Sequence, residues 1–219
     1  MLDVLLVAPV VPGLPPLSWM TEITSISAQQ GVNLSFVGGE TITKADVANV
    51  LRARHDIVLW AGHGRPGELL GPGWKVQPKW IAVQIRCGLP KLVILAACGS
   101  GITGRHMTAL AAEVAHSGIN TVAFLTNVDD RAALIYDQEL IRAAAAGADM
   151  WSAHRVAVEA IRDDYPRTAK AATLIPGFTD GIRDFIVRIE NLENGLNNLC
   201  IRVGDMKKSL DKLSQHFNL

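Results

Sequence analysis

The sequence predicts an α/β fold in which helices cover both faces of a mostly parallel β-sheet. Short apolar runs rich in β-branched residues alternate with longer segments of helical periodicity over roughly the first 178 residues. The two central runs, D-I-V-L-W (56–60) and K-L-V-I-L-A-A (91–97), lack the polar alternation of a half-exposed strand. Strands buried on both faces have this composition, and they occur in parallel sheets between two helical layers. A C-terminal segment repeats its apolar residues with a different period.

The expected strands are short and apolar, and turn-forming residues separate them from their neighbours. They cover residues 2–8, 32–37, 56–60, 91–97, 120–125 and 172–177, the last of which could close the sheet. The expected helices have apolar residues at steps of three and four. They cover residues 18–30, 41–54, 80–87, 107–116, 130–146 and 148–162. Thr43, with Asp46 three residues later, indicates a capped start for the second of these helices.

Residues 64–79 contain four glycines and three prolines. Glycine and proline interrupt regular structure, so this stretch predicts a long loop or a small hairpin. It follows the strand at 56–60 directly.

The C-terminal segment, residues 179–219, predicts a coiled-coil helix. Apolar residues from Ile182 to Phe217 recur at alternating steps of three and four, over about five heptads. Branched residues on one seam and leucines on the other favour a parallel dimer, and the alternative is a long amphipathic helix packed on its own domain. Gly195 and Gly204 each cost roughly 1 kcal/mol of helix stability, so the helix needs a partner surface. We therefore expect a domain at 1–178, and a homodimer or partner-protein contact through the 182–217 heptads.

Composition and charge exclude several function classes. The chain is 49% hydrophobic and 19% charged with a formal net charge of zero, as in a soluble globular protein. A neutral chain has no overall attraction to DNA or RNA, so no nucleic-acid partner is expected. No window approaches the roughly 18 to 20 unbroken apolar residues of a membrane span.

The N-terminus and the cysteines favour a cytoplasmic location. The first apolar run carries Asp3, has no basic region and is broken by Pro9 and Pro12, which indicates a buried strand rather than a signal peptide. The three cysteines are irregularly spaced and form no C-x-x-C pair, so they predict neither a disulfide framework nor a zinc site. We expect a reducing compartment, no metal and no cofactor.

Two reactive side chains follow the two central strands. His63 ends V-L-W-A-G-H-G, and Cys98 ends the apolar part of V-I-L-A-A-C-G-S-G. The carboxyl ends of neighbouring parallel strands meet at one edge of a sheet, so the two side chains emerge together if these strands are neighbours. A thiol beside an imidazole is the minimum for nucleophilic catalysis by cysteine. Gly64 and Gly99 would let backbone N–H groups approach a developing oxyanion without a Cβ in the way.

Other interpretations of these residues remain open. Cys98 could be a small buried hydrophobic residue, and His63 could be a turn residue satisfied by a carbonyl. The stretch G-S-G-I-T-G (99–104) also matches a dinucleotide-binding fingerprint, although it lies in mid-chain and the acids Asp129 and Asp130 come too far downstream. No such setting surrounds Cys87 or Cys200, which we expect to be inert.

The His and Cys blocks together resemble the CHAT family, bacterial relatives of caspases and separases among the clan CD cysteine peptidases. Its members carry an apolar strand ending in G-H-G and a later strand ending in A-C-x-S. The stretch I-N-T-V-A-F-L-T-N-V-D-D-R-A-A (119–133) resembles the next strand of the family, and residues 134–157 resemble its following helix pair. The resemblance covers roughly residues 1–178. It implies a caspase-like three-layer sandwich with a mostly parallel central sheet.

The resemblance also implies roles for individual residues. Cys98 would be the nucleophile, and His63 would act as acid and base, protonating the leaving amine without an obligatory third carboxylate. The N–H groups of Gly64 and Cys98 would form the oxyanion hole, with Gly99 beside them.

Substrate binding is implied for a third group of residues. Asn127, Asp129 and Asp130 would lie near a pocket for a basic side chain, although relatives commonly carry Trp-Asp where this chain has Thr126 and Asn127. Asp130 could instead be the N-terminal cap of the following helix.

The sequence therefore predicts a cysteine endopeptidase that cleaves a protein or peptide substrate, and the resemblance implies that it takes part in bacterial signalling or defence. The alternative is a catalytically inactive scaffold of the same fold that acts through its coiled coil.

Overall fold

The sheet at the centre of the molecule has the predicted, mostly parallel arrangement. The computed structural model describes residues 1–65, 67–97 and 110–177. Within them, one six-stranded sheet has the strand order β2–β1–β3–β7–β8–β9. Its strands are β1 (Leu2–Pro9), β2 (Val32–Gly39), β3 (Ile57–Ala61), β7 (Leu92–Ala96), β8 (Asn120–Phe124) and β9 (Ala172–Ile175). The pairs from β2 to β8 are parallel, and β9 closes the edge antiparallel to β8.

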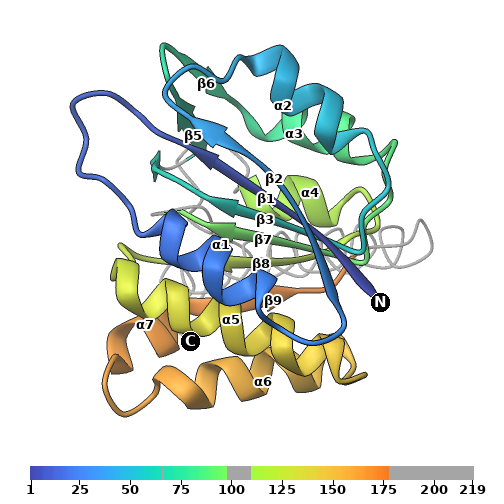
Figure 1. Cartoon of the computed structure of the whole chain (residues 1–219), viewed down its shortest axis with the longest axis vertical. Helices are drawn as coiled ribbons and strands as arrows, with labels where there is room; N and C mark the ends of the chain where they lie inside the picture. Colours follow the sequence, from blue (N-terminus) through green and yellow to red (C-terminus); the bar gives the residue numbers. More distant parts are fainter. Residues whose placement is uncertain (66, 98–109, 178–219) are drawn as a thin grey trace, which may run out of the picture. The chain divides into compact units, whose positions relative to one another are not determined.

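Helices cover both faces of this sheet, because successive side chains of a strand point to opposite sides. In β1, Val4 and Leu6 face one layer while Leu5 and Val7 face the other, and all four are buried. Figure 1 shows the sheet between the two layers. The first layer is formed by α1 (Trp19–Ser27), α5 (Asp130–Ala145), α6 (Met150–Ile161) and α7 (Pro166–Ala171). The second is formed by α2 (Lys44–Leu51), α3 (Pro78–Ile85) and α4 (Leu110–Ala115).

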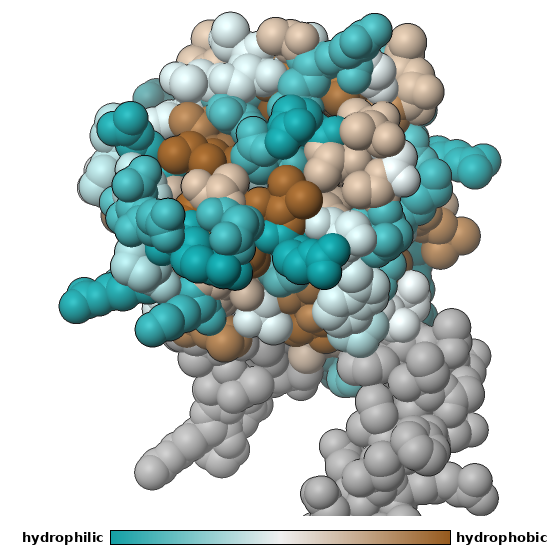
Figure 2. Space-filling view, turned by 90° about the horizontal axis from the view of Figure 1, so that it is seen from below, coloured by the Kyte–Doolittle hydropathy of each residue, from teal (hydrophilic) through white to brown (hydrophobic). Residues whose placement is uncertain are grey.

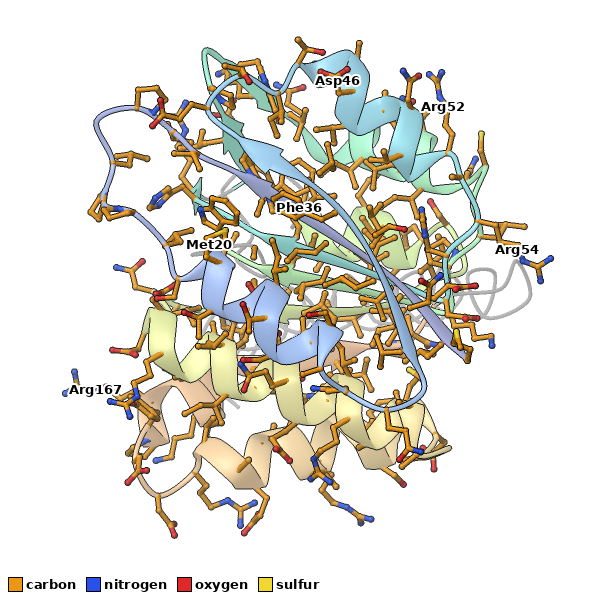
Figure 3. All side chains as sticks on the ribbon, in the orientation of Figure 1. Met20, Phe36, Asp46, Arg52, Arg54 and Arg167 are labelled. Carbon is orange, nitrogen blue, oxygen red and sulfur yellow. The ribbon has the colours of Figure 1, made fainter. Side chains whose placement is uncertain are left out.

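The outer surfaces of these layers carry a few exposed apolar side chains. Figure 2, viewed from the α6 side, shows polar side chains interspersed with apolar ones. Phe36 of β2, labelled in Figure 3, stacks on Trp19 of α1 with ring centroids 5.3 Å apart. This contact fastens the start of α1 to the edge of the sheet.

The glycine-rich stretch after β3 forms a small antiparallel sheet rather than an irregular loop. Its strands are β4 (Gly64–Arg65), β5 (Glu68–Gly71) and β6 (Trp74–Val76). The carboxylate of Glu68 pairs with Arg65 at 2.6 Å and with Lys75 at 2.5 Å, one partner from each flanking strand. The hydrogen bonds from Lys75 and Arg65 lower the pKa of Glu68. The ion pairs join all three strands next to the residue that follows His63.

The main departure from the sequence prediction lies before the last strand. The helix predicted to stop before Pro166 does so, but Pro166 itself begins α7. A proline is well suited to the first position of a helix, because its missing N–H would have no partner there. The six residues of α7 are too few to show a helical period.

Some predictions fall on other parts of the chain. The coiled coil at 179–219, its 182–217 heptads, the boundary at 178 and residues 107–109 of one predicted helix lie outside the described residues. Among the helices that the structure describes, none is long and apolar enough to cross a membrane.

The start of α2 forms the capping box that Thr43 and Asp46 predict. Thr43 Oγ1 accepts a hydrogen bond from the N–H of Asp46 at 3.1 Å, and the Asp46 carboxylate accepts one from the N–H of Thr43 at 2.8 Å. Figure 3 labels Asp46 at the first turn of the helix. The hydrogen bonds from Thr43 lower the pKa of Asp46.

Replacing Thr43 with alanine should therefore lower the free energy of unfolding by about 1 kcal/mol, because the N–H of Asp46 loses its partner, the Thr43 hydroxyl. Thr41→Ala, an exposed change two residues earlier, is the matched control. Urea titration followed by circular dichroism measures both variants, and equal stabilities would contradict the role of the cap.

Candidate active site

The two strands that lead to His63 and Cys98 are neighbours. β3 and β7 pair in parallel, with Ala61 opposite Ala96, and the N–H of Gly62 donates to the carbonyl of Ala96 at 3.3 Å. The two strands therefore end at the same level on one edge of the sheet. Cys98 and Gly99 lie outside the described residues, so their predicted pairing with His63 stays a prediction.

Gly62 is required by close packing at the end of β3. A Cβ built on this residue would lie 2.8 Å from Nε1 of Trp60 and 3.4 Å from Cδ of Pro9. The Trp60 indole is 1% exposed, and its Nε1 has no hydrogen-bond partner among the described residues. The chain passes directly over this ring and then presents His63.

Gly64 presents its backbone N–H away from the neighbouring strand. The N–H of Leu70 donates to the carbonyl of His63 at 3.0 Å, and Gly64 faces Leu69 in the β4–β5 ladder. In an antiparallel ladder this places Gly64 at a non-hydrogen-bonded pair, whose N–H groups point outward. The N–H of Gly64, a donor that the predicted oxyanion hole requires, is therefore not used by the hydrogen bonds of the β4–β5 ladder.

His63 is held by a backbone carbonyl from the loop between β1 and α1. Its Nε2 lies 2.9 Å from the carbonyl oxygen of Pro15. A carbonyl only accepts hydrogen bonds, so Nε2 carries the proton and Nδ1 is left to exchange one. Figure 1 shows this loop on the side of the sheet where the parallel strands end. A histidine with a purely structural role in a turn would make the same hydrogen bond, so this contact alone does not assign a catalytic role to His63.

A pocket of about 500 Å³, part of it open to solvent, lies beside His63. It is bounded by the ends of β3 and β7 and by helices α1 and α5. Polar side chains from three of these elements line it together with Ala97, the residue before Cys98. They are His63, Ser18, Glu22, Asp130 and Asp137.

The structure separates the three residues expected to bind substrate. Asp130 lines the His63 pocket, where it accepts hydrogen bonds from Ser18 Oγ at 2.6 Å and from the Ser18 N–H at 3.1 Å. Asp129 is the N-terminal cap of α5, a position that the sequence offered to Asp130. Asp129 and Asn127 line another pocket, beside Arg167. Only Asp130 of the three lies with His63.

Two buried acids in the pocket escape the sequence prediction. Glu22 of α1 is 5% exposed and Asp137 of α5 is 0% exposed. Their signal in the sequence is an acid on the apolar stripe of a helix. Glu22 falls between Trp19 and Ile26 at steps of three and four, and Asp137 lies four residues before Ile141.

Burial sets the protonation of this pair. It is the largest cause that raises the pKa of Asp137 well above its usual range, and the neighbouring Glu22 raises it further. Burial also raises the pKa of Glu22 to about 7, against a lowering by its hydrogen bond with Asp137 and with a further increase from Asp130. At neutral pH the pair therefore retains at least one proton.

The pair makes stability depend on pH. In the unfolded chain Glu22 ionises near 4.5, whereas in the folded protein it holds its proton to about 7. The folded state thus binds more protons over this window, so the free energy of unfolding falls as pH rises through it. Glu22→Gln removes the group that ionises. Relative to the wild type, this variant should gain on the order of 2 kcal/mol between pH 4.5 and pH 8.

Urea titrations at the two pH values measure that difference. Glu40→Gln, the same change at an exposed position, is the control and should leave the pH dependence of the wild type unaltered. A Glu22→Gln variant whose stability tracks that of the wild type at both pH values would contradict the assignment.

Comparison with known proteins places the fold but not the activity. No family model matches the chain, and no curated protein sequence matches it. Its structure is similar to the crystal structure of the Arg-specific cysteine proteinase gingipain R, with a TM-score of 0.64 and 11% identity over 80% of this chain and 46% of the other. It is also similar to the complex of the pro- and mature domains of RgpB from Porphyromonas gingivalis, with a TM-score of 0.60 and 10% identity over 80% and 47% of the two chains.

This chain thus spans about half the length of those proteins. At such low identity the likeness concerns the fold, which is a caspase-like α/β fold shared with these cysteine proteinases.

Proposed function

We propose that the protein is a cysteine endopeptidase in which Cys98 is the nucleophile and His63 transfers the proton. The observation that carries the proposal is the parallel pairing of β3 with β7, because it brings the segments leading to His63 and Cys98 to one edge of the sheet. The likeness in fold to the cysteine proteinase gingipain R supports it.

The geometry around His63 suits a simple sequence of proton transfers. The Cys98 thiol gives its proton to Nδ1 of His63, the nitrogen that Pro15 leaves available, and the thiolate attacks the scissile carbonyl. The imidazolium then protonates the leaving amine as the C–N bond breaks and an acyl-enzyme forms. Water, deprotonated by the same ring, hydrolyses the thioester and returns the thiol.

Backbone donors would stabilise the oxyanion in both steps. The outward-pointing N–H of Gly64 is one donor, and the N–H of Cys98 is the other that we propose. No side chain at Gly64 obstructs the approach of a peptide, and Gly99 extends the same freedom beyond Cys98.

The substrate that the pocket favours has a basic residue before the scissile bond. The pocket beside His63 contains the carboxyl groups of Glu22, Asp130 and Asp137, and none of its described lining residues is Lys or Arg. Gingipain R is an Arg-specific proteinase, which supports the same preference here. Asn127 and Asp129 line the separate pocket near Arg167, so in this proposal they do not contact the basic side chain.

An inactive scaffold is the second candidate, and the Pro15–His63 hydrogen bond favours it to the extent that a satisfied histidine needs no catalytic partner. In that case the C-terminal heptads would do the work by binding a second copy or a partner protein. A role in bacterial signalling or defence in the cytoplasm belongs to either proposal. Dinucleotide binding at residues 99–104 concerns a stretch outside the described residues.

A peptide probe carrying a thiol-reactive group distinguishes the two candidates. The peptidase should be labelled at Cys98, and Cys98→Ala should abolish both labelling and peptide cleavage. His63→Ala should lower the cleavage rate by roughly 10²- to 10⁴-fold, since it removes the general acid and base. Cys87→Ala, at an exposed free cysteine, is the control that should change neither signal. Full activity in Cys98→Ala or His63→Ala would refute the proposal.

A matched pair of neighbouring acids tests the substrate pocket. Asp130→Asn should reduce the ratio of kcat/KM for arginyl over citrullinyl peptides by about fivefold, because an exposed ion pair contributes up to about 1 kcal/mol. Asp129→Asn should leave this ratio unchanged, since Asp129 caps α5 and lies outside the pocket. Equal ratios in the two variants would place specificity elsewhere.

A further inference from the structure

We propose that the pocket beside His63 takes up a guanidinium or ammonium group with the release of a proton, and that the paired carboxyls of Glu22 and Asp137 give up that proton. The inference rests on the proposed function for the identity of the cation, which would be a substrate side chain. Proton exchange with the occupant does not depend on cleavage.

The two carboxyls belong to different helices and meet inside the pocket. Glu22 projects from α1 and Asp137 from α5, and these helices pack against each other on the same face of the sheet. Both side chains are almost fully buried, yet both line the cavity. They are therefore shielded from bulk water, and they lie in the wall of the cavity that a group entering from the His63 side would occupy.

Asp137 has no partner that would stabilise its charge. Its carboxyl interacts with that of Glu22, and neither of its oxygens accepts a hydrogen bond from an N–H or hydroxyl donor within the described part of the chain. The polar side chain that interacts with Asp137 is Glu22, which is another acid and raises the pKa of Asp137. A buried carboxylate without a donor is costly, so the vacant hydrogen-bonding capacity of Asp137 calls for a donor that the described residues do not supply.

The other titratable groups around the pair do not supply it either. Asp130 adds a third acid on α5, and His63 at the end of β3 is engaged with Pro15. Tyr136, next to Asp137 on α5, directs its hydroxyl to Nδ1 of His154 on α6 at 2.5 Å. The strand ends contribute apolar Ala61 and Ala96. Among the described lining residues, the pocket therefore offers acids without an internal cation.

Two adjacent buried carboxyls without a counter-cation cannot both ionise, so the empty pocket holds a proton between them. The raised pKa values of Glu22 and Asp137 agree with this arrangement. A guanidinium group entering the pocket brings one positive charge and several N–H donors, which stabilise the second carboxylate. The proton then leaves to solvent. On binding, the pocket gains the positive charge of the cation and loses that of the proton, so its net charge stays the same.

Proton release makes affinity depend on pH. If binding releases one proton, the dissociation constant rises by up to tenfold for each unit by which the pH falls. A neutral ureido group does not stabilise a second carboxylate, so its binding would release no proton and its dissociation constant would not depend on pH in this way. The pocket would favour basic side chains at pH 8 and would discriminate less between basic and neutral ones near pH 6.

Calorimetry on the intact chain tests this without any need for catalysis. Agmatine is the guanidinium probe, and N-butylurea, which has a ureido group and no ammonium group, is the neutral control. Titrations at pH 7 in two buffers of different ionisation enthalpy measure the number of protons released. Agmatine should release a proton and should weaken by close to tenfold between pH 7 and pH 6, whereas the ureido compound should show neither effect.

Two variants locate the source of the proton. In Glu22→Gln/Asp137→Asn the proton release and the pH dependence should disappear, and in His63→Gln both should persist. Proton release that is unchanged in the double variant, or lost in His63→Gln, would overturn the proposal. So would agmatine that binds without proton release to the wild type, or that fails to bind at millimolar concentration; both results come from the native sequence and do not depend on how the variants fold.

Peptide kinetics separate this inference from the proposed function. Arginyl peptides cleaved with an arginine-to-citrulline preference that is constant from pH 6 to pH 8 would overturn proton linkage and leave the peptidase standing. If Cys98 is inert but agmatine binding still releases a proton, the peptidase proposal fails and the proton linkage stands.

Discussion

The parallel pairing of β3 with β7 is the constraint on which the site depends. Both strands are buried on both faces, and their register sets Ala61 opposite Ala96. A slip of one residue would turn every side chain of β7 to the other helical layer, so burial fixes this register strongly. The level at which the two strands end is therefore determined by the core. The position of His63 is therefore set by buried apolar residues of β3 and β7, which carry no reactive group.

The helical layer next to this edge combines packing with an acidic pocket. α1 and α5 bury Ile26, Tyr136 and Leu140 in one core, yet each helix also directs a carboxyl group inward at Glu22 and Asp137. An isosteric apolar side chain at either position would spare the cost of burying a polar group. Conflicts of this kind between local pattern and global fold are expected at functional sites, where stability is given up for binding.

The sequence was sufficient for the positions of the strands of the six-stranded sheet and for most helices, because strands buried on both faces and amphipathic helices leave distinct periods. It did not predict the order of the strands, which depends on contacts between distant segments. It also predicted that His63 and the segment before Cys98 share an edge if their strands are neighbours, and the parallel pairing of β3 with β7 meets that condition. The separation of Asp130 from Asp129 could not be predicted, because adjacent acids at a helix start are equivalent until the helix phase is known. Glu22 and Asp137 were missed for a related reason: their meeting depends on how α1 and α5 pack, which no local pattern encodes.

The segment from Pro15 to Glu22 connects features that are far apart in sequence. The Pro15 carbonyl holds the His63 ring, Ser18 donates to Asp130, and Glu22 reaches Asp137. One short stretch of chain thus touches the imidazole, the mouth of the pocket and its floor. The loop and the start of α1 therefore contact the site at three points. Because this one segment contacts His63, Asp130 and Asp137, the orientation of the imidazole ring and the acidic lining of the pocket are set by the same few residues.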